Sequence, residues 1–300
     1  MPVFKKINQY LSLVKFSHTV FALPFAMIGL TLGIFHQLKT DSNWQWKTEF
    51  PILLTKVLLC MIFARSAAMA FNRFLDRKFD ALNPRTAQRE IPAGIISPKH
   101  ALTFTIINCL LFILTTWFIN TLVFYLSFVA LFVVLFYSYT KRITPLCHLV
   151  LGLGLSLSPI GAFLAVTAQF QLLPVLFSLI VFTWVAGFDI IYALQDEEFD
   201  KAQNLFSIPA VLGKRNALLV SNVLHFISAI MVLLAGFDGG FNWLFWMGAM
   251  VFIALLLYQH LLVSPNDLSK VNLAFANTNG IASIVFALFA ISSFIIQYCL

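Results

Sequence analysis

Two groups of polar side chains, far apart in the sequence, have the spacing of metal ligands on a helix. Asn72, Asp76 and Asp80 follow one another at intervals of four residues. On a helix their oxygen atoms therefore project from one face in successive turns. The second group has a similar helical spacing and consists of Asp189, Tyr192, Asp196 and Asp200. The two groups predict two oxygen-rich helix ends that work together.

Each group ends a long apolar segment, and Asp189 lies inside one, where an ionisable side chain is costly and usually functional. Carboxylates that converge need a cation. Mg²⁺ is the natural one because it combines carboxylate ligands with water and phosphate oxygens. The predicted ligands of this Mg²⁺, which would bridge the protein to a diphosphate, are Asn72, Asp76, Asp80, Asp196 and Asp200. The predicted catalytic residues are Asp76, Lys141, Asp189 and Asp196.

Basic residues near the acidic groups are candidates for binding the substrate. Lys141 and Arg142, together with Arg77, can pair with phosphate oxygens, although they are equally well explained as signals of membrane topology. Arg65 lies two turns before the first acidic group on a similar face. Arg65 is expected either to bind the carboxylate of an aromatic substrate or to form a hydrogen bond between helices. His148 is expected at the membrane interface.

The elements that must position these residues are membrane-spanning helices. Of the 300 residues, 60% are hydrophobic and only 10% are charged, against about 25% charged in soluble domains. No polar stretch is long enough for a separate soluble domain, so residues 1–300 are expected to form one membrane domain. Nine apolar segments have the length of a helical span: Ser17–His36, Pro51–Ala70, Ala101–Ile119, Thr121–Ser138, Cys147–Val166, Leu172–Ala193, Asn216–Gly236, Trp243–Leu262 and Asn272–Tyr298. We therefore expect an all-α integral membrane protein with nine transmembrane helices around a central cavity.

The lysines and arginines predict the orientation of these helices. They concentrate at the N-terminus and in every second loop, whereas the opposite loops hold few of them. By the positive-inside rule the N-terminus is cytoplasmic and the C-terminus lies outside. The acidic groups then lie near the cytoplasmic face of the cell (inner) membrane. The net charge of +7 reflects topology and contact with lipid, and no nucleic-acid partner is expected.

These motifs resemble those of the UbiA superfamily of intramembrane prenyltransferases. The first family motif, N-D-x-x-D-x-x-x-D, matches Asn72 to Asp80, and the second, D-x-x-Y-A-x-x-D-x-x-x-D, matches Asp189 to Asp200. A basic loop follows at Arg85 to Gly94, and a Y-x-x-x-K-R motif matches Tyr137, Lys141 and Arg142. The chain departs from the family pattern at Arg73, Glu90 and Asn204, which stand where aspartate, proline and glycine are usual.

The resemblance implies an enzyme that transfers a polyprenyl group from a polyprenyl diphosphate to an aromatic acid during the synthesis of respiratory quinones. It implies Mg²⁺ as cofactor, and substrate contacts from Arg65, Arg77, Tyr137, Lys141, Arg142 and Tyr192. The acceptor is expected to be of the 4-hydroxybenzoate or the dihydroxynaphthoate type. Haem, a lipid glycerol phosphate and a chlorophyll precursor stay open as other acceptors. A secondary transporter is the alternative of a different class.

Overall fold

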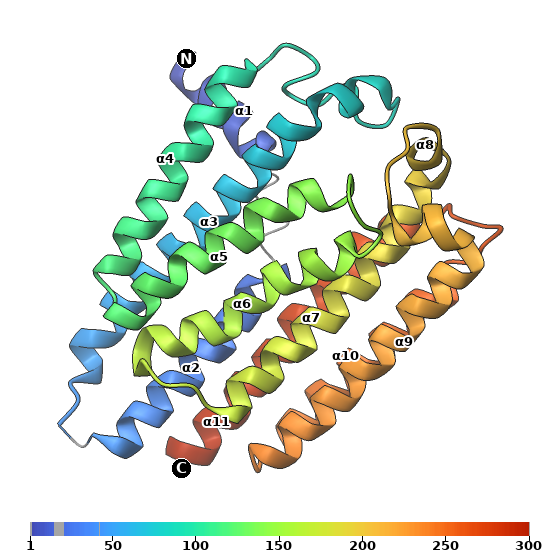
Figure 1. Cartoon of the computed structure of the whole chain (residues 1–300). Coiled ribbons are helices and arrows are strands. Elements are labelled where there is room, and N and C mark those ends of the chain that lie inside the picture. The colour runs from blue at the N-terminus through green and yellow to red at the C-terminus, as the bar shows by residue number, and fades with distance from the viewer. Residues whose placement is uncertain (1, 15–20, 42, 300) are drawn as a thin grey trace.

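The computed structural model describes residues 2–14, 21–41 and 43–299, and every regular element in these ranges is helical (Figure 1). The elements are α1 (Pro2–Leu13), α2 (Leu23–Thr40), α3 (Trp46–Leu82), α4 (Pro98–Trp117), α5 (Thr121–Thr140), α6 (Cys147–Thr167), α7 (Leu172–Ala193), the 3₁₀ turn η2 (Leu194–Asp196), α8 (Glu197–Ala202), α9 (Ile208–Asp238), α10 (Trp243–Leu262), the π-helical turn η3 (Leu273–Thr278) and α11 (Asn279–Cys299). The chain is therefore all-α over the described ranges, as predicted.

Eight helices of the described chain are long and apolar enough to cross a bilayer. Each overlaps one of the predicted segments from the second to the ninth. The first predicted segment begins among residues 15–20, which lie outside the described ranges, and its described part forms α2. The membrane character of the chain is thus confirmed, whereas α2 is not among the eight.

The long helices lie side by side in a bundle in which α7 occupies the interior (Figure 1). The α6 helix packs against both α2 and α7, and α7 in turn packs against α9. The contact between α2 and α6 requires a glycine. A Cβ atom at Gly29 would lie only 2.0 Å from the carbonyl oxygen of Pro159. Small residues allow helix backbones in a membrane to approach in this way.

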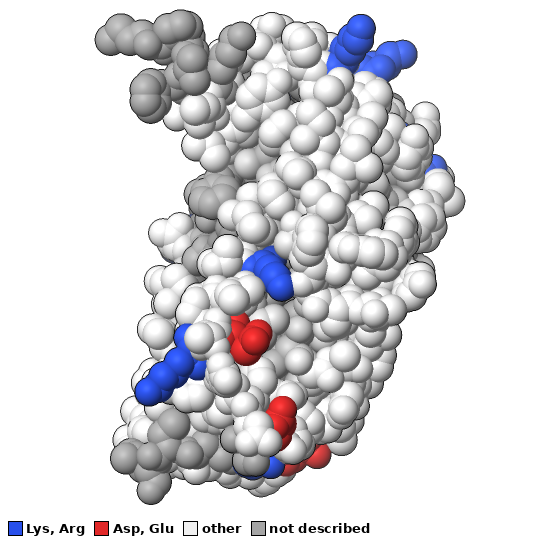
Figure 2. Space-filling model, turned by 90° about the vertical axis from the view of Figure 1, so that its left-hand side faces the viewer, with Lys and Arg blue, Asp and Glu red and all other residues white. Residues whose placement is uncertain are grey.

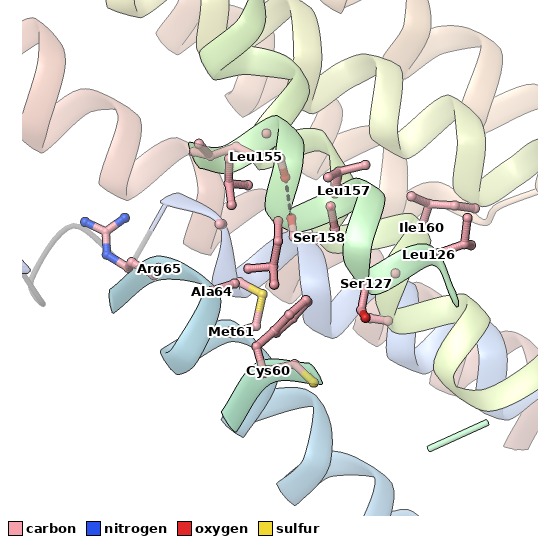
Figure 3. Close-up of a pocket in the computed structure, with 18 of the residues that line it drawn as sticks. Cys60, Met61, Ala64, Arg65, Leu126, Ser127, Leu155, Leu157, Ser158 and Ile160 are labelled. Atoms are coloured by element: carbon pink, nitrogen blue, oxygen red, sulfur yellow. Dashed lines mark hydrogen bonds between the residues drawn. The ribbon is translucent and has the colours of Figure 1, made fainter. Parts of the chain in front are cut away.

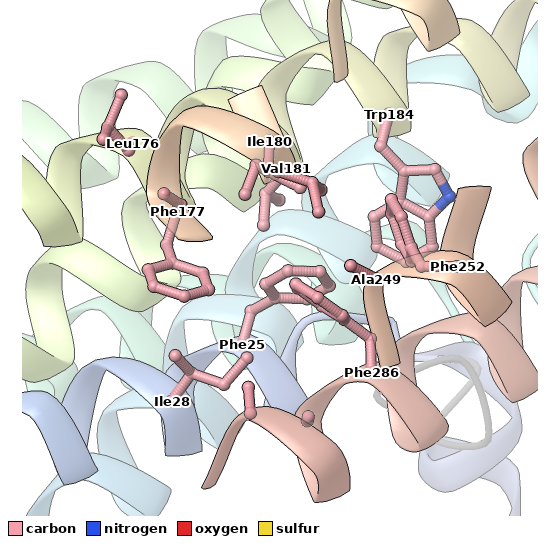
Figure 4. Packing of buried hydrophobic residues seen from close by; sticks show 14 of the residues in the cluster. Phe25, Ile28, Leu176, Phe177, Ile180, Val181, Trp184, Ala249, Phe252 and Phe286 are labelled. Carbon is pink, nitrogen blue, oxygen red and sulfur yellow. The ribbon is translucent and has the colours of Figure 1, made fainter. Parts of the chain in front are cut away.

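One part of the bundle, between α2, α7, α10 and α11, is filled by aromatic side chains (Figure 4). Phe25, Trp184, Phe252 and Phe286 pack with ring centroids 5.0–6.4 Å apart. The indole nitrogen of Trp184 donates a hydrogen bond of 2.8 Å to Asn279 Oδ1, which satisfies its polar end inside the core. Because this region is solidly packed, space for a substrate has to lie elsewhere.

The outer surface of the bundle is apolar. Figure 2 shows one side of the molecule, where uncharged side chains cover almost everything and only a few charged ones interrupt them. Large side chains that are at least half exposed include Leu110, Tyr125, Phe132 and Phe226. A soluble monomer rarely exposes apolar area on this scale. The surface therefore suits contact with lipid.

The two acidic groups are supported differently. The first lies on α3, a continuous helix of 37 residues that carries Asn72, Asp76 and Asp80 as predicted. The second was expected to continue the helix that carries Asp189, and this expectation was wrong. The α7 helix ends at Ala193, and the chain passes through η2 into the short helix α8. The tighter 3₁₀ turn redirects the chain, so the last two aspartates do not continue the face of α7.

Candidate active site

A polar cavity of about 170 Å³ brings together both acidic groups and the basic loops between them. Its walls come from the end of α3, the loop after it, the end of α5, the start of α6, and the stretch from α7 to α8. The predicted site residues that line it are Asn72, Asp76, Asp80, Tyr137, Lys141, Arg142, Asp189, Tyr192, Asp196 and Asp200. Residues more than 100 positions apart in the sequence thus share one cavity.

Two aspartates of this cavity form ion pairs with the predicted phosphate-binding residues. Arg142 Nη2 lies 2.6 Å from Asp76 Oδ1, and Lys141 Nζ lies 2.7 Å from Asp200 Oδ1. Burial by itself would lower the pKa of Lys141, but the neighbouring Asp200 carboxylate outweighs burial and raises it. Lys141 therefore keeps its positive charge at the end of α5.

Two further aspartates of the cavity, Asp80 and Asp196, pair with arginines of the loop after α3. Arg85 binds Asp196 in bidentate fashion, with nitrogen–oxygen distances of 2.5 and 3.1 Å, and donates a hydrogen bond of 2.9 Å to the hydroxyl of Tyr192. Arg89 lies 2.7 Å from Asp80. The predicted site residues did not include these arginines, although the resemblance named their loop. Their R-T-x-x-R spacing beside two acidic groups was the available signal.

This pairing decides how the acidic residues lie in the absence of substrate. In the described part of the chain no three His, Cys, Asp or Glu side chains come close enough to hold a metal ion. Four of the five aspartates of the two groups instead pair with a lysine or arginine each, and Asp189 pairs with His148. Asp80 Oδ2 is nevertheless buried without a hydrogen-bond partner, which is the kind of oxygen that a hard cation accepts. The donor set therefore fits Mg²⁺.

His148, which was expected at the membrane interface, lines the polar cavity. Its side chain is only 3% exposed. Nδ1 lies 2.7 Å from Asp189 Oδ2, and Nε2 accepts a hydrogen bond of 3.4 Å from the backbone N–H of Ile208. The helix start at Cys147 directs the side chain inwards, towards α7, so that tertiary packing overrides the polarity of its loop.

The structure does not bring Arg77 or Arg65 into the polar cavity. The guanidinium of Arg77 stacks on the ring of Phe74 and donates to the carbonyl oxygen of the same residue. Arg65 instead lines a neighbouring apolar cavity. Of the residues that depart from the family pattern, Asn204 adopts a left-handed conformation with φ of 53°, as asparagine can. Glu90 accepts a hydrogen bond from Ser12, which ties the basic loop to α1.

The apolar cavity has a volume of about 370 Å³ and lies between α3, α4, α5 and α6 (Figure 3). Its walls are almost entirely aliphatic and aromatic. Ser127 and Ser158, labelled in Figure 3, donate their hydroxyl protons to carbonyl oxygens one turn earlier. Tyr137 lines both this cavity and the polar one. The two cavities are therefore neighbours at Tyr137, with charge on one side and hydrocarbon on the other.

A charged cavity beside a hydrocarbon-lined cavity inside a helical bundle is the arrangement expected of an enzyme that handles the diphosphate of a lipid-like molecule. The family model for the UbiA prenyltransferase family matches residues 22–286, and the chain belongs to this family. It is therefore a prenyltransferase.

Named relatives agree with this assignment. The chain is 31% identical over 228 residues to the 4-hydroxybenzoate octaprenyltransferase of Enterobacter sp. (strain 638), covering 76% of this chain and 78% of the relative. It is 30% identical over 243 residues to the enzyme of the same name from Escherichia fergusonii, covering 81% and 83%. Both relatives are named as aromatic polyprenyltransferases.

Solved structures share the fold. The apo structure of a UbiA homolog from Aeropyrum pernix K1 is 26% identical and has a TM-score of 0.76. The match covers 94% of this chain and 98% of that one. A UbiA homolog from Archaeoglobus fulgidus, solved with DMAPP and Mg²⁺, is 21% identical with a TM-score of 0.73, covering 95% of this chain and 99% of that one. At this lower identity the second likeness concerns the fold alone.

Proposed function

We propose that this enzyme transfers a polyprenyl group from a polyprenyl diphosphate to an aromatic hydroxy acid in the synthesis of a respiratory quinone. The observation that carries the proposal is the junction of the two cavities at Tyr137. A polyprenyl diphosphate is charged at one end and hydrocarbon along the rest, and its reactive carbon lies where the two meet. The names of the relatives support a 4-hydroxybenzoate-type acceptor, and a dihydroxynaphthoate-type acceptor fits the same chemistry.

Mg²⁺ fits as the cofactor. Asn72, Asp76, Asp80, Asp196 and Asp200 would hold it, and when bound it would draw negative charge from the departing diphosphate. Magnesium and a prenyl diphosphate together in the Archaeoglobus fulgidus homolog support this assignment. Lys141, Arg142, Arg85 and Arg89 would move from the carboxylates to the phosphate oxygens, because an arginine that gives up its carboxylate needs another anion.

The apolar cavity would bind the prenyl tail nearest the reacting carbon. Excluding water there protects the allylic cation, which would otherwise be hydrolysed. Ring faces such as that of Tyr137 can stabilise a cation by about 0.5–2 kcal/mol each. Arg65, at the wall of this cavity, is suited to bind the carboxylate of the acceptor. Arg77 has no place in this scheme because it contacts Phe74 outside both cavities.

The proposal includes the orientation in the membrane. With α2 as the first span, the chain would cross the cell (inner) membrane nine times, with the N-terminus in the cytoplasm and the C-terminus outside. The distribution of lysine and arginine supports this orientation. It would place the diphosphate cavity near the cytoplasmic face, where a water-soluble aromatic acid can reach it.

The test is incubation of membranes that contain the protein with labelled polyprenyl diphosphate and a panel of aromatic acids, with products identified by mass. We expect a prenylated acid whose formation needs Mg²⁺ and stops with excess EDTA. Full turnover after verified removal of divalent metal would defeat the magnesium assignment. Movement of an intact substrate across sealed vesicles, without release of diphosphate, would favour the secondary transporter instead.

A further inference from the structure

Asp189 differs from the other aspartates that line the polar cavity. Asp76, Asp80, Asp196 and Asp200 each pair with a lysine or arginine, whereas over the described ranges Asp189 has His148 as its only hydrogen-bond partner. Asp189 also lies deeper, inside the membrane-spanning part of α7. Among the described residues, the partner of Asp189 is therefore a histidine and not a lysine or arginine.

The contacts of His148 fix which of its nitrogens carries the proton. Nε2 accepts the backbone N–H of Ile208, at the start of α9, so in the neutral ring the proton lies on Nδ1. Nδ1 then donates to Asp189 Oδ2 at 2.7 Å. The one hydrogen bond of Asp189 in the described structure goes to Oδ2, so Oδ1 has none, and the residue lines the polar cavity.

Asp189 and His148 lie where the ring of the acceptor must lose a proton. Asp189 and His148 line the polar cavity together with Tyr137, the residue at which the two cavities meet. The reacting carbon of the prenyl donor, and with it the ring of the acceptor, belong at this junction. A partly buried carboxylate that is held by one hydrogen bond, with no hydrogen bond to its second oxygen, is suited to accept a proton there.

From this geometry we infer that His148 is a positioning residue that holds Asp189 as the base for the acceptor ring. The inference rests on the proposed function. The allylic carbon–oxygen bond breaks and its electron pair leaves on the diphosphate oxygen. A π pair of the aromatic ring forms the new carbon–carbon bond. The electron pair of the ring C–H bond then returns to the ring, and its proton passes to Asp189 Oδ1.

The test compares variants of His148 on the aromatic acid that the wild type prenylates. His148→Leu removes both hydrogen bonds of the ring, whereas His148→Gln keeps an amide that can donate to Asp189 and accept from Ile208. His225→Leu is the matched control, because His225 is buried and hydrogen-bonded to His260 and to the carbonyl oxygen of Trp184 but lines neither cavity. If His148→Leu is not recovered folded, His148→Asn replaces it, since its shorter amide cannot reach both partners.

We expect His148→Leu to lower kcat by about 10- to 100-fold, the loss typical of removing a group that orients a reactive one. The KM for polyprenyl diphosphate should stay near the wild-type value, because the substitution leaves unchanged the four basic residues proposed to bind the diphosphate. An acceptor deuterated at the attacked ring carbon should show a primary isotope effect on kcat in His148→Leu that the wild type lacks, since proton loss becomes slow. His148→Gln should recover most of the rate.

Three results would overturn the inference alone: an unchanged kcat in His148→Leu, a lower kcat without any isotope effect, or the same losses in His225→Leu. The last two would mean that the histidine only stabilises the fold. A wild type that prenylates no aromatic acid would overturn the proposed function, and the inference with it. The two failures are thus told apart by the wild-type reaction.

Discussion

Asp76 and Asp196 are the two residues whose roles can be tested most directly. Each belongs to one acidic group and each is held by an arginine, Asp76 by Arg142 and Asp196 by Arg85. Asp76→Asn and Asp196→Asn should each lower turnover by at least about 100-fold, as the loss of a single electrostatic stabiliser does. The measurement is product formation per folded enzyme, with folding checked by detergent-solubilised yield and thermal midpoint.

Glu197→Gln is the control for this pair of variants. Glu197 follows Asp196 directly, but it pairs with Lys201 and Lys214 and does not line the polar cavity. Its loss should leave turnover within a few-fold of the wild type. Near-normal turnover in both aspartate variants, together with inactive Glu197→Gln, would mean that the site lies on another face.

The one-to-one ion pairs also predict how the ligands bind. Mg²⁺ alone must take carboxylates from Lys141 and the arginines, which then have no anionic partner. Diphosphate alone must take these basic residues from the carboxylates, which then have no cationic partner. Each should bind weakly by itself, whereas both together satisfy every charge. We expect Mg²⁺ plus inorganic diphosphate to raise the melting temperature by more than the sum of the separate shifts, because a ligand that binds the native state more tightly stabilises it more at the same concentration. Additive shifts would contradict the exchange of partners.

At the scale of elements, the apolar cavity should determine how the enzyme handles long prenyl chains. Gly161 on α6 lines this cavity, and a Cβ atom placed there would meet nothing within 4 Å. It lies about 20 Å along the helix from His148, at a rise of about 1.5 Å per residue. Gly161→Leu should therefore raise the KM for a long polyprenyl diphosphate several-fold and leave a short one, such as geranyl diphosphate, unchanged.

Leu153→Phe provides the comparison for this variant, because Leu153 lies on the same helix but is exposed and lines neither cavity. Leu153→Phe should leave the KM unchanged for both the long and the short prenyl diphosphate. Equal losses with short and long donors in Gly161→Leu would show that the cavity does not hold the tail, or that the variant disturbs the packing of α6.

At the scale of the whole molecule, the charged loops should be reachable from one side of the membrane. The loop after α3 and the α8 segment meet through the ion pair of Arg85 and Asp196, so they lie at the same end of the bundle. In a background without native cysteines, Gln88→Cys and Ala202→Cys should react with an impermeant thiol reagent only from the cytoplasm. Gln169→Cys, on the turn between α6 and α7, should react only from outside. Labelling of all three from one side would overturn the helix count.

Most of the architecture could be predicted because a membrane imposes it locally. Spans of about 20 apolar residues are required to satisfy the backbone in lipid, and that requirement can be read from composition and length. The beginning of the first predicted span is the part left open, since residues 15–20 lie outside the described ranges. The break after Ala193 was missed because a 3₁₀ turn and a continued helix have the same hydropathy pattern.

The sequence by itself determined that the chain is a helical membrane protein with two acidic motifs and basic loops at the ends of its spans, because spacing and hydropathy are local properties. Only the tertiary structure decided which charges meet. Arg85, Arg89 and His148 each contact a carboxylate that lies on another element or beyond a turn of the chain, and the pattern around them does not contain that partner. Tyr137 marks the junction of two cavities for the same reason: a cavity is bounded by several helices at once, and no single segment encodes it.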